Sequence, residues 1–387
     1  MTKQEALHKL IRFARIYGWS RALNKAVART RLSWVRYPFV RRQQATISLV
    51  GCGQFAFSCI CFFLQKNLGN KFLSTYDSDT TQAQSLARYY GFRQVSPSID
   101  ELMANPALTT LYIASNHASH TDYAIAGLQR GLTVYVEKPI SVTYTQLVAL
   151  LAAYRSSTGR LFAGYNRPYS SAIRQLREQV QASALSGAFS ISYVVNGHQI
   201  PSDHWYRLPQ EGTRICGNLG HWLDLTIHIL NWRGLPNWID LTVTYSNQEE
   251  PDDNLVVTMS TNKQDLVSLM LTSRSEPFEG ITEAVNIQYQ DIIARIDDFR
   301  QLTIWRGTSL KKWRYVPKDV GHQRAVLQPF KSDNRDWREV ELSTLLMLHL
   351  KEMVLARQTG YRFVIQDELD QLDAQIQQNE AIHTSSI

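Results

Sequence analysis

The turn Gly51-Cys52-Gly53-Gln54-Phe55-Ala56 constrains the fold of this chain more than any other feature. It follows residues 46–50, an apolar and β-branched run typical of a buried parallel strand. Gly51 permits a sharp turn, Gly53 lets the backbone approach a phosphate, and Ala56 lets the next helix pack on the sheet. The helix expected over residues 55–66 points its free N–H groups at that phosphate. The segment therefore predicts a dinucleotide-binding unit, with Gly51, Gly53, Gln54, Phe55 and Ala56 as cofactor contacts.

An acidic residue stands where such a unit needs one. A second strand, expected over residues 72–76, ends in Asp77, which lies 21 residues beyond Ala56. In dinucleotide folds a carboxylate at this place accepts hydrogen bonds from the adenosine ribose. The acid favours NAD over NADP, because it would repel a 2′-phosphate, although Ser78 and Thr80 leave NADP open. The alternative is a tight turn with an unrelated aspartate.

Length and composition set the broad class. A chain of 387 residues, 44% of them apolar, is long enough for two domains with separate cores. The four cysteines show neither metal-ligand nor disulfide spacing, so we expect no metal site and a reducing, cytoplasmic location. We find no run of about 18 apolar residues and no signal-peptide pattern, so no membrane span is expected.

The basic charge is concentrated at the N-terminus. The whole chain carries +7, but residues 1–44 hold 11 Lys and Arg side chains against one acid, Glu5, so the remainder carries −3. Apolar residues recur there at helical spacing, which predicts two short amphipathic helices. Such an extension can lie on an anionic membrane surface, dock on a partner, wrap a neighbouring subunit, or pack on its own chain. Nucleic-acid binding is not expected, because nothing else extends the basic patch.

The predicted elements divide the rest of the chain into two domains and an α/β fold class. Residues 45–168 alternate strand and helix, as in a doubly wound Rossmann domain, with helices at 81–90, 99–104, 121–130 and 142–156 and further strands at 133–136 and 161–165. Residues 169–387 predict an α+β domain with an open, mostly antiparallel sheet. Its expected strands cover 188–196, 240–246, 255–260, 265–272, 283–288, 292–297 and 302–306. Helices are expected at 218–230, 339–358 and 366–381, the last two amphipathic.

Three further segments carry a family resemblance. They are residues 111–116 (Leu-Tyr-Ile-Ala-Ser-Asn) with His120 four residues on, 131–139 (Gly-Leu-Thr-Val-Tyr-Val-Glu-Lys-Pro) and 164–168 (Gly-Tyr-Asn-Arg-Pro). With the Gly-rich turn and Asp77, they resemble the glucose–fructose oxidoreductase / inositol dehydrogenase / MocA family over residues 45–380. Glu137-Lys138-Pro139 at the end of a strand is the most specific of these marks.

The resemblance implies an N-terminal NAD(P) domain and a C-terminal domain whose sheet carries the substrate site and pairs with another subunit. Ser115 and Lys138 are expected as further cofactor contacts, and Asn116, His120, Glu137 and Asn166 are expected toward the nicotinamide. The implied function is hydride transfer at a hydroxyl or keto carbon of a sugar, cyclitol or nucleotide sugar. Two alternatives stay open: a glycosidase that oxidises and re-reduces one sugar on bound NAD, and a catalytically idle NAD-binding partner subunit.

Lys138 is the first candidate for proton transfer. It follows the carboxyl end of a parallel strand, where ligands bind in open α/β sheets, and Pro139 stiffens the turn. An ordinary lysine pKa of about 10.4 is too high for a base at neutral pH. Burial and an oxidised nicotinamide would lower it, whereas Glu137 opposes that change. The resemblance implies that Lys138 binds the substrate hydroxyl; the alternative is a surface lysine.

A helix rich in histidine supplies the second candidate. His221, Asp224 and His228 are spaced i, i+3 and i+7, so they share one helical face. Histidine beside a carboxylate suits a general base, and we prefer His221 with Asp224 in this role. The chain departs from the family here, because Gly217 stands where many members have an acid or amide. His228 as the base is the alternative, and either histidine can be an interior one.

Substrate contacts are expected from a loop and two arginines. Residues 200–207 include His204 and Trp205, whose rings and donors suit a sugar or phosphate, although a subunit contact fits equally well. Arg167 and Arg214 are suited to hold a phosphate or carboxylate, and His221 would also touch the substrate.

Overall fold

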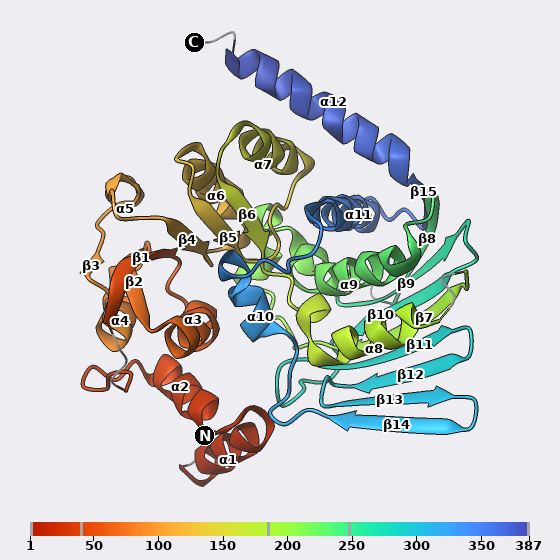
Figure 1. The fold of residues 1–387 in the computed structure, drawn as a ribbon, viewed down its shortest axis with the longest axis horizontal. Coiled ribbons are helices and arrows are strands. Elements are labelled where there is room, and N and C mark those ends of the chain that lie inside the picture. Colours follow the sequence, from red (N-terminus) through yellow and green to blue (C-terminus); the bar gives the residue numbers. More distant parts are fainter. Residues whose placement is uncertain (1–2, 39–41, 184–185, 247–248, 385–387) are drawn as a thin grey trace.

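The structure is a computed structural model that describes residues 3–38, 42–183, 186–246 and 249–384. Two sheets lie side by side, and α8, α9 and α11 cover the face of the larger sheet that is turned toward the smaller one (Figure 1). The predicted extension includes residues 1–2 and 39–41, which lie outside the described residues. No helix among the described residues is long and apolar enough to cross a membrane.

The first domain is a parallel, doubly wound sheet with the order β3-β2-β1-β4-β5-β6. Its strands are β1 (Arg42–Val50), β2 (Asn70–Tyr76), β3 (Gln94–Val95), β4 (Thr110–Ile113), β5 (Thr133–Val136) and β6 (Arg160–Ala163). Its helices are α3 (Cys61–Leu68), α4 (Thr80–Tyr90), α5 (Ile99–Ala104), α6 (His120–Gln129) and α7 (Tyr144–Ser156). This confirms the predicted fold class, because apolar strands alternate with helices that cover both faces.

The second domain is built on one nine-stranded sheet, in the order β14-β13-β12-β11-β7-β10-β9-β8-β15. Its strands are β7 (Phe189–Asn196), β8 (Trp238–Tyr245), β9 (Asn254–Thr261), β10 (Leu266–Thr272), β11 (Thr282–Tyr289), β12 (Ile292–Asp297), β13 (Gln301–Arg306), β14 (Ser309–Arg314) and β15 (Gly360–Val364). All neighbouring strands are antiparallel except β7 and β10. The helices are α8 (Ser171–Gln181), α9 (Gly220–Leu230), α10 (His322–Val326), α11 (Trp337–Leu355) and α12 (Ile365–Thr384).

Some expected elements differ from those observed. Five observed elements were not predicted from the sequence, namely α8, α10, β3, β14 and β15. The helix expected from residue 55 begins with a π-helical turn, η1 (Ala56–Ile60), before α3, and α9 is likewise preceded by η6 (Ile215–Leu219). The helix α11 is not amphipathic as expected, because 14 of its residues are buried between α9, α12 and β15.

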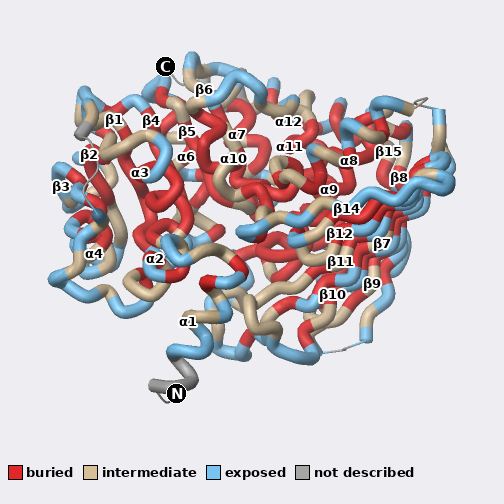
Figure 2. Tube along the Cα trace, turned by 60° about the horizontal axis from the view of Figure 1, so that its bottom comes forward, coloured by how far each residue is buried: buried red, intermediate tan, exposed pale blue. Residues whose placement is uncertain are grey.

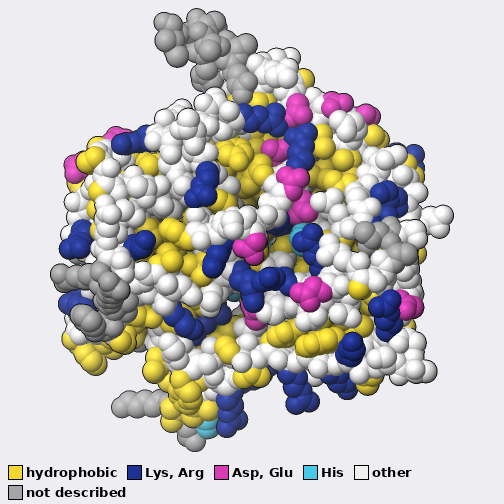
Figure 3. All heavy atoms as spheres, viewed as in Figure 1, with side chains coloured by type: hydrophobic (Ala, Val, Ile, Leu, Met, Phe, Trp, Pro, Cys, Tyr) yellow, Lys and Arg dark blue, Asp and Glu magenta, His cyan; other side chains and the backbone are white. Residues whose placement is uncertain are grey.

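The N-terminal helices pack on the body of their own chain. The helix α2 (Trp19–Thr30) lies beside α3 and α4 (Figures 1 and 2), where buried Asn24 accepts hydrogen bonds from Tyr89 and Tyr90. The helix α1 (Lys3–Tyr17) contacts the other domain, since the Tyr17 hydroxyl donates to Glu279 over 2.7 Å. The sequence left four possible contacts for this extension: a membrane surface, a partner, a neighbouring subunit or its own chain. In the described residues, the extension packs on its own chain. Figure 3 shows basic side chains interspersed with acidic and apolar ones on one face of the molecule.

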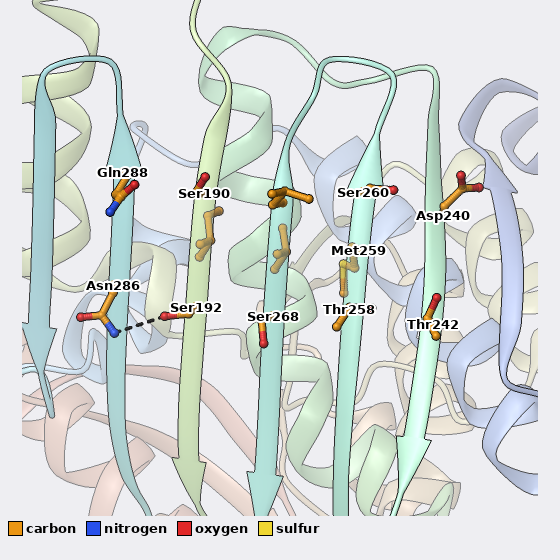
Figure 4. Close-up of a pocket in the computed structure, with 13 residues that line it drawn as sticks. Ser190, Ser192, Asp240, Thr242, Thr258, Met259, Ser260, Ser268, Asn286 and Gln288 are labelled. Atoms are coloured by element: carbon orange, nitrogen blue, oxygen red, sulfur yellow. Dashed lines mark hydrogen bonds between the residues drawn. The ribbon is translucent and has the colours of Figure 1, made fainter.

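The larger sheet leaves one face open. Burial alternates along its strands, as in β7 and β10 (Figure 2). Successive side chains of a strand point to opposite faces of the sheet, so the exposed ones lie on the face away from the helices. A shallow hollow of about 450 Å³ on this face is lined mainly by small polar side chains, such as Ser190, Ser192 and Thr258 (Figure 4). A hydrogen bond joins Asn286 to Ser192 over 3.2 Å. Among the described residues that line the hollow, Asp240 is the one charged side chain, and it is paired with Arg362, so no cluster of charged groups suited to hydride chemistry lies there.

Candidate active site

A cavity of about 790 Å³ lies at the carboxyl ends of the parallel strands. Residues that directly follow β1, β2, β4 and β5 line it, together with residues of the second domain. Those residues are Val50, Gly51, Gly53, Gln54, Phe55, Tyr76, Asp77, Ser78, Ala114, Ser115, Asn116, His117, His120, Tyr123, Glu137, Lys138, Asn166, Trp205, Tyr206, His221 and His322. Ligands of doubly wound sheets bind at this edge.

The Gly-rich turn has room for a phosphate. Gly51 has a φ of +87°, and a Cβ there would lie 2.4 Å from the carbonyl carbon of Ala114. A Cβ on Gly53 would meet nothing within 4 Å. The first glycine is therefore required by the backbone, whereas the second leaves open space beside the start of a helix. These two features fit a dinucleotide pyrophosphate.

Asp77 is fixed next to this turn. Its carboxylate accepts hydrogen bonds from the Cys52 amide over 2.6 Å and from the Asp79 amide over 2.8 Å. These bonds hold both oxygens at the end of β2, and further lone pairs face the cavity that Asp77 lines. A ribose with two hydroxyls matches such an acceptor.

Asn116 and His120 tie the loop after β4 to its neighbours. The Asn116 amide donates to Glu211 over 2.7 Å, which connects the two domains. The ring nitrogens of His120 face the Pro139 carbonyl at 2.8 Å and the Ser115 carbonyl at 3.1 Å. Burial lowers the pKa of His120 to about 4, so this ring is neutral and positions the loop that carries Lys138.

Glu137, which is buried, and Lys138, which is half-buried, lie side by side after β5. Glu137 accepts a hydrogen bond from Tyr135 over 2.8 Å, and Lys138 donates to the Gly217 carbonyl over 2.7 Å. Burial raises the pKa of Glu137 to about 7 and lowers that of Lys138 to about 8. The Lys138–Pro139 peptide bond is cis. Lys138 thus lies in the cavity with a pKa near the physiological range.

Two histidines from the second domain face the same cavity. His221 is 9% exposed, and among the described residues neither its Nδ1 nor that of His322 has a hydrogen-bond partner. Burial, followed by the charges of Arg167 and Lys138, holds the pKa of His221 well below its ordinary value. His322 begins α10, and its ring centroid lies 5.7 Å from that of Phe55. These unpartnered nitrogens are available to a ligand.

Asp224 does not support His221 as expected. Its fully buried carboxylate accepts two hydrogen bonds of 2.7 Å from Arg335 and one of 3.0 Å from Ser343. A carboxylate inside the protein needs a cation, and Arg335 supplies it on the side of α9 away from the cavity. His228 lies there too, bonded to Glu339 over 2.9 Å. The expected His–Asp pair is therefore not formed.

The departure at Gly217 has a steric reason. A Cβ at Gly217 would lie 2.6 Å from the Tyr206 ring and 2.9 Å from the His117 ring. The place of the family's acid or amide is thus filled by Tyr206, while the Gly217 carbonyl accepts from Lys138. His117, Tyr206 and His322 were not among the expected site residues. For His322, the glycine just before it, Gly321, is a local sequence feature that indicates a turn, and its φ is +91°.

The two arginines expected to bind the substrate, Arg167 and Arg214, are held by carboxylates of the protein. Arg167 forms a two-pronged ion pair with Glu283, and Arg214 binds Asp253 and the His198 carbonyl. Trp205 lines the cavity, its ring 4.8 Å from that of His117, but His204 does not line it and instead caps the following turn. Asn166 lines the cavity and donates to the Val320 carbonyl over 2.5 Å.

Comparisons with known proteins agree with this geometry. Residues 45–165 match an oxidoreductase family with an NAD-binding Rossmann fold. An uncharacterized oxidoreductase of Streptococcus pneumoniae is 24% identical over 54% of this chain and 58% of that protein. An inositol 2-dehydrogenase of Ralstonia nicotianae is 23% identical over 51% of this chain and 57% of that protein. The matched part of the chain thus spans less than three fifths of each of these relatives.

Solved structures share the fold over most of both domains. A dehydrogenase from Chromobacterium violaceum covers 82% of this chain and 96% of its own, with a TM-score of 0.69 at 18% identity. Levoglucosan dehydrogenase in complex with NADH and levoglucosan covers 83% of this chain and 100% of its own, with a TM-score of 0.69 at 12% identity. The match over residues 45–165 therefore supports the resemblance of this chain to the glucose–fructose oxidoreductase / inositol dehydrogenase / MocA family of NAD-binding oxidoreductases.

Proposed function

We propose that this protein is an NAD-dependent dehydrogenase or reductase that acts on a hydroxyl or keto carbon of a sugar, cyclitol or nucleotide sugar. The observation that carries the proposal is one continuous cavity that runs from Gly53 and Asp77 to Lys138 and His221. Dinucleotide-type and proton-transfer groups line the same space. Relatives named inositol 2-dehydrogenase and levoglucosan dehydrogenase support the substrate class.

The cofactor would lie along the edge of the parallel sheet. We assign the pyrophosphate to the turn Gly51–Ala56, with Gln54 and Phe55 at the helix start, and the adenosine ribose to Asp77. Ser115, Asn116, His120, Glu137 and Asn166 would surround the nicotinamide half. When bound, the nicotinamide accepts or supplies the hydride. The acid at the ribose position favours NAD, as the sequence alone already indicates.

Lys138 is the better proton acceptor of the two candidates. Its pKa of about 8 lies close to working pH, where a general base is most effective. His221 lacks a carboxylate partner and has a much lower pKa, so we assign it a different role. As a neutral ring with a free nitrogen, it would hydrogen-bond the substrate hydroxyl and fix its orientation beside Lys138. In the oxidation direction, the hydroxyl proton of the substrate would pass to the neutral amine of Lys138.

A panel of sugars, cyclitols and nucleotide sugars with NAD⁺, followed by absorbance of the reduced cofactor, tests the proposal. Lys138→Met should lower kcat by about 10²- to 10⁴-fold, the range of general-base losses, while NAD⁺ affinity measured by calorimetry stays within about threefold. The control is Lys263→Met, because Lys263 also donates to a backbone carbonyl, that of Gly234, outside the cavity. Sugar release without net cofactor reduction would contradict the proposal, as would an unimpaired Lys138→Met.

A further inference from the structure

A second cavity, of about 310 Å³, continues the first on the far side of His221 and His322. Both cavities are lined by Phe55, Asn166, His221 and His322. These four shared residues thus lie between the two spaces. The N-terminal helices form the outer wall of the second cavity. Phe13 and Tyr17 of α1 and Arg21 and Lys25 of α2 line it.

The N-terminal helices are anchored beside this cavity. The Ile16 carbonyl accepts a hydrogen bond from the Lys318 amide over 2.8 Å, and Arg12 lies 4.0 Å above the Phe278 ring. At the other end, Arg31 just after α2 donates to the Cys52 carbonyl over 2.7 Å, beside the Gly-rich turn. The extension is thus held at both domains, and its side chains have defined positions at the cavity.

The cations that line this cavity fall into two groups. Arg167 and Lys318 are neutralised, by Glu283 over 2.7 Å and by Glu279 over 3.0 Å. Arg21 and Lys25 have no carboxylate within ion-pair distance among the described residues. They lie over aromatic rings instead, Arg21 at 4.7 Å from Tyr17 and Lys25 at 4.1 Å from Phe13.

Two neighbouring cations without a counter-charge oppose each other. Burial, and then the charges of Arg29 and Arg21, lower the pKa of Lys25 to about 8. The orphaned Nδ1 atoms of His221 and His322 add unfilled hydrogen-bonding capacity to the same space. An anion would relieve this repulsion.

We propose that the second cavity binds an anionic group of the substrate, a phosphoryl or carboxylate, through Arg21 and Lys25. The inference rests on the proposed function and narrows its substrate class to acidic carbohydrates. The N-terminal helices then act in substrate selection. The expected anion ligands Arg167 and Arg214 would not serve, because carboxylates already hold them.

Kinetics with matched substrates tests this inference. Glucose, glucose 6-phosphate and glucuronate differ mainly in charge, and each is compared in the wild type, Arg21→Gln, Lys25→Met and Arg29→Gln. Arg29 is the control, because it is an exposed cation of the same helix. Losing one charge-assisted contact should raise KM for the acidic sugar about tenfold or more with little change in kcat. Glucose kinetics and the Arg29→Gln variant should be unchanged.

A binding experiment separates this inference from the proposed function. Thermal stabilisation of the whole protein by inorganic phosphate or by acetate, at constant ionic strength, requires no turnover. We expect stabilisation of the wild type and of Arg29→Gln, and its loss in the Arg21→Gln/Lys25→Met double variant. If the double variant loses only the response to phosphate, the second cavity is a phosphoryl site, and if it loses only the response to acetate, the cavity is a carboxylate site. No stabilisation, or equal stabilisation of the double variant, overturns the inference even if the dehydrogenase activity is confirmed.

Discussion

The Lys138 ammonium donates to the Gly217 carbonyl over 2.7 Å, and the half-buried Lys138 side chain lies beside Glu137. Water does not solvate its charge well there, so the neutral amine becomes accessible near pH 8 instead of near 10. The charge of Glu137 opposes this change but does not cancel it. A residue that is an ordinary cation at the surface thus becomes a plausible proton acceptor through burial.

The pH dependence of activity follows from this pKa. Only the neutral amine accepts a proton, so kcat/KM for alcohol oxidation should rise about tenfold per pH unit up to about pH 8 and then level off. For ketone reduction the protonated form is needed, so the rate should fall above that pH. Lys138→Arg should abolish the transition, because a guanidinium stays charged. A transition near pH 8 that persists in Lys138→Arg would assign it to another group.

Gly51 and Gly53 should respond differently to alanine. Gly53→Ala places a methyl group in open space where a phosphate would lie, so NAD⁺ affinity should fall at least about tenfold with little change in Tm. Gly51→Ala should lower Tm, because its Cβ would clash with Ala114 and its φ is positive. Calorimetry and thermal unfolding of both variants measure this contrast. Equal NAD⁺ affinity of Gly53→Ala and the wild type would refute the phosphate assignment.

At the scale of elements, a buried ion pair and buried hydrogen bonds hold α9 to α11 and to the residues just before α11. Asp224 binds Arg335 and Ser343, and His228 binds Glu339. Burial by itself would raise the pKa of Glu339, but the hydrogen bond from His228 and the charge of Arg335 outweigh it and hold the pKa at about 2. These contacts fix the helix whose other side presents His221 to the cavity.

Asp224→Asn should therefore affect stability and not chemistry. Removing one partner of a buried ion pair leaves Arg335 uncompensated and should cost about 3 kcal/mol of unfolding free energy. The control is Asp240→Asn, because the Asp240–Arg362 pair is exposed and should cost less than about 1 kcal/mol. Denaturant unfolding measures both. A stable Asp224→Asn with a large loss of kcat would restore the catalytic role that the sequence suggested.

At the scale of the whole molecule, the nine-stranded sheet leaves one face uncovered by helices. Large apolar side chains stand on it among the small polar ones, including Leu266, 61% exposed, and Ile293, 50% exposed. A flat face of this kind buries apolar area well when a second copy covers it. We expect the homo-oligomer implied by the family resemblance to form through this surface.

Charge on this face should dissociate the oligomer. Leu266→Lys/Ile293→Lys places two cations in the interface and should shift sedimentation velocity from oligomer to monomer while NAD⁺ affinity is kept. Leu355→Lys is the control, because Leu355 is 56% exposed at the end of α11, away from the sheet face. A wild type that sediments as a monomer, or a double variant that remains oligomeric, would exclude this interface.

Local patterns in the sequence were sufficient for much of the fold. The helix at residues 99–104 and the strands at 133–136 and 292–297 match the observed bounds residue for residue. The Gly-rich turn, Asp77 and Lys138, which the sequence predicted as site residues, line one cavity, because each follows a strand whose direction fixes where the next residues point. Helical and strand periodicity is a short-range property, so it is readable within some ten residues.

Only the tertiary structure decided which charges meet. Helical spacing placed Asp224 beside His221, but Arg335, which lies 111 residues further on, took its carboxylate. The positions of His322, Arg21 and Lys25 at the cavity depend on how α10 and α2 pack across domains, and no local pattern encodes this. Ion pairing and cavity formation depend on contacts between distant segments, because the cost of burying a charge is set by whatever the fold brings next to it.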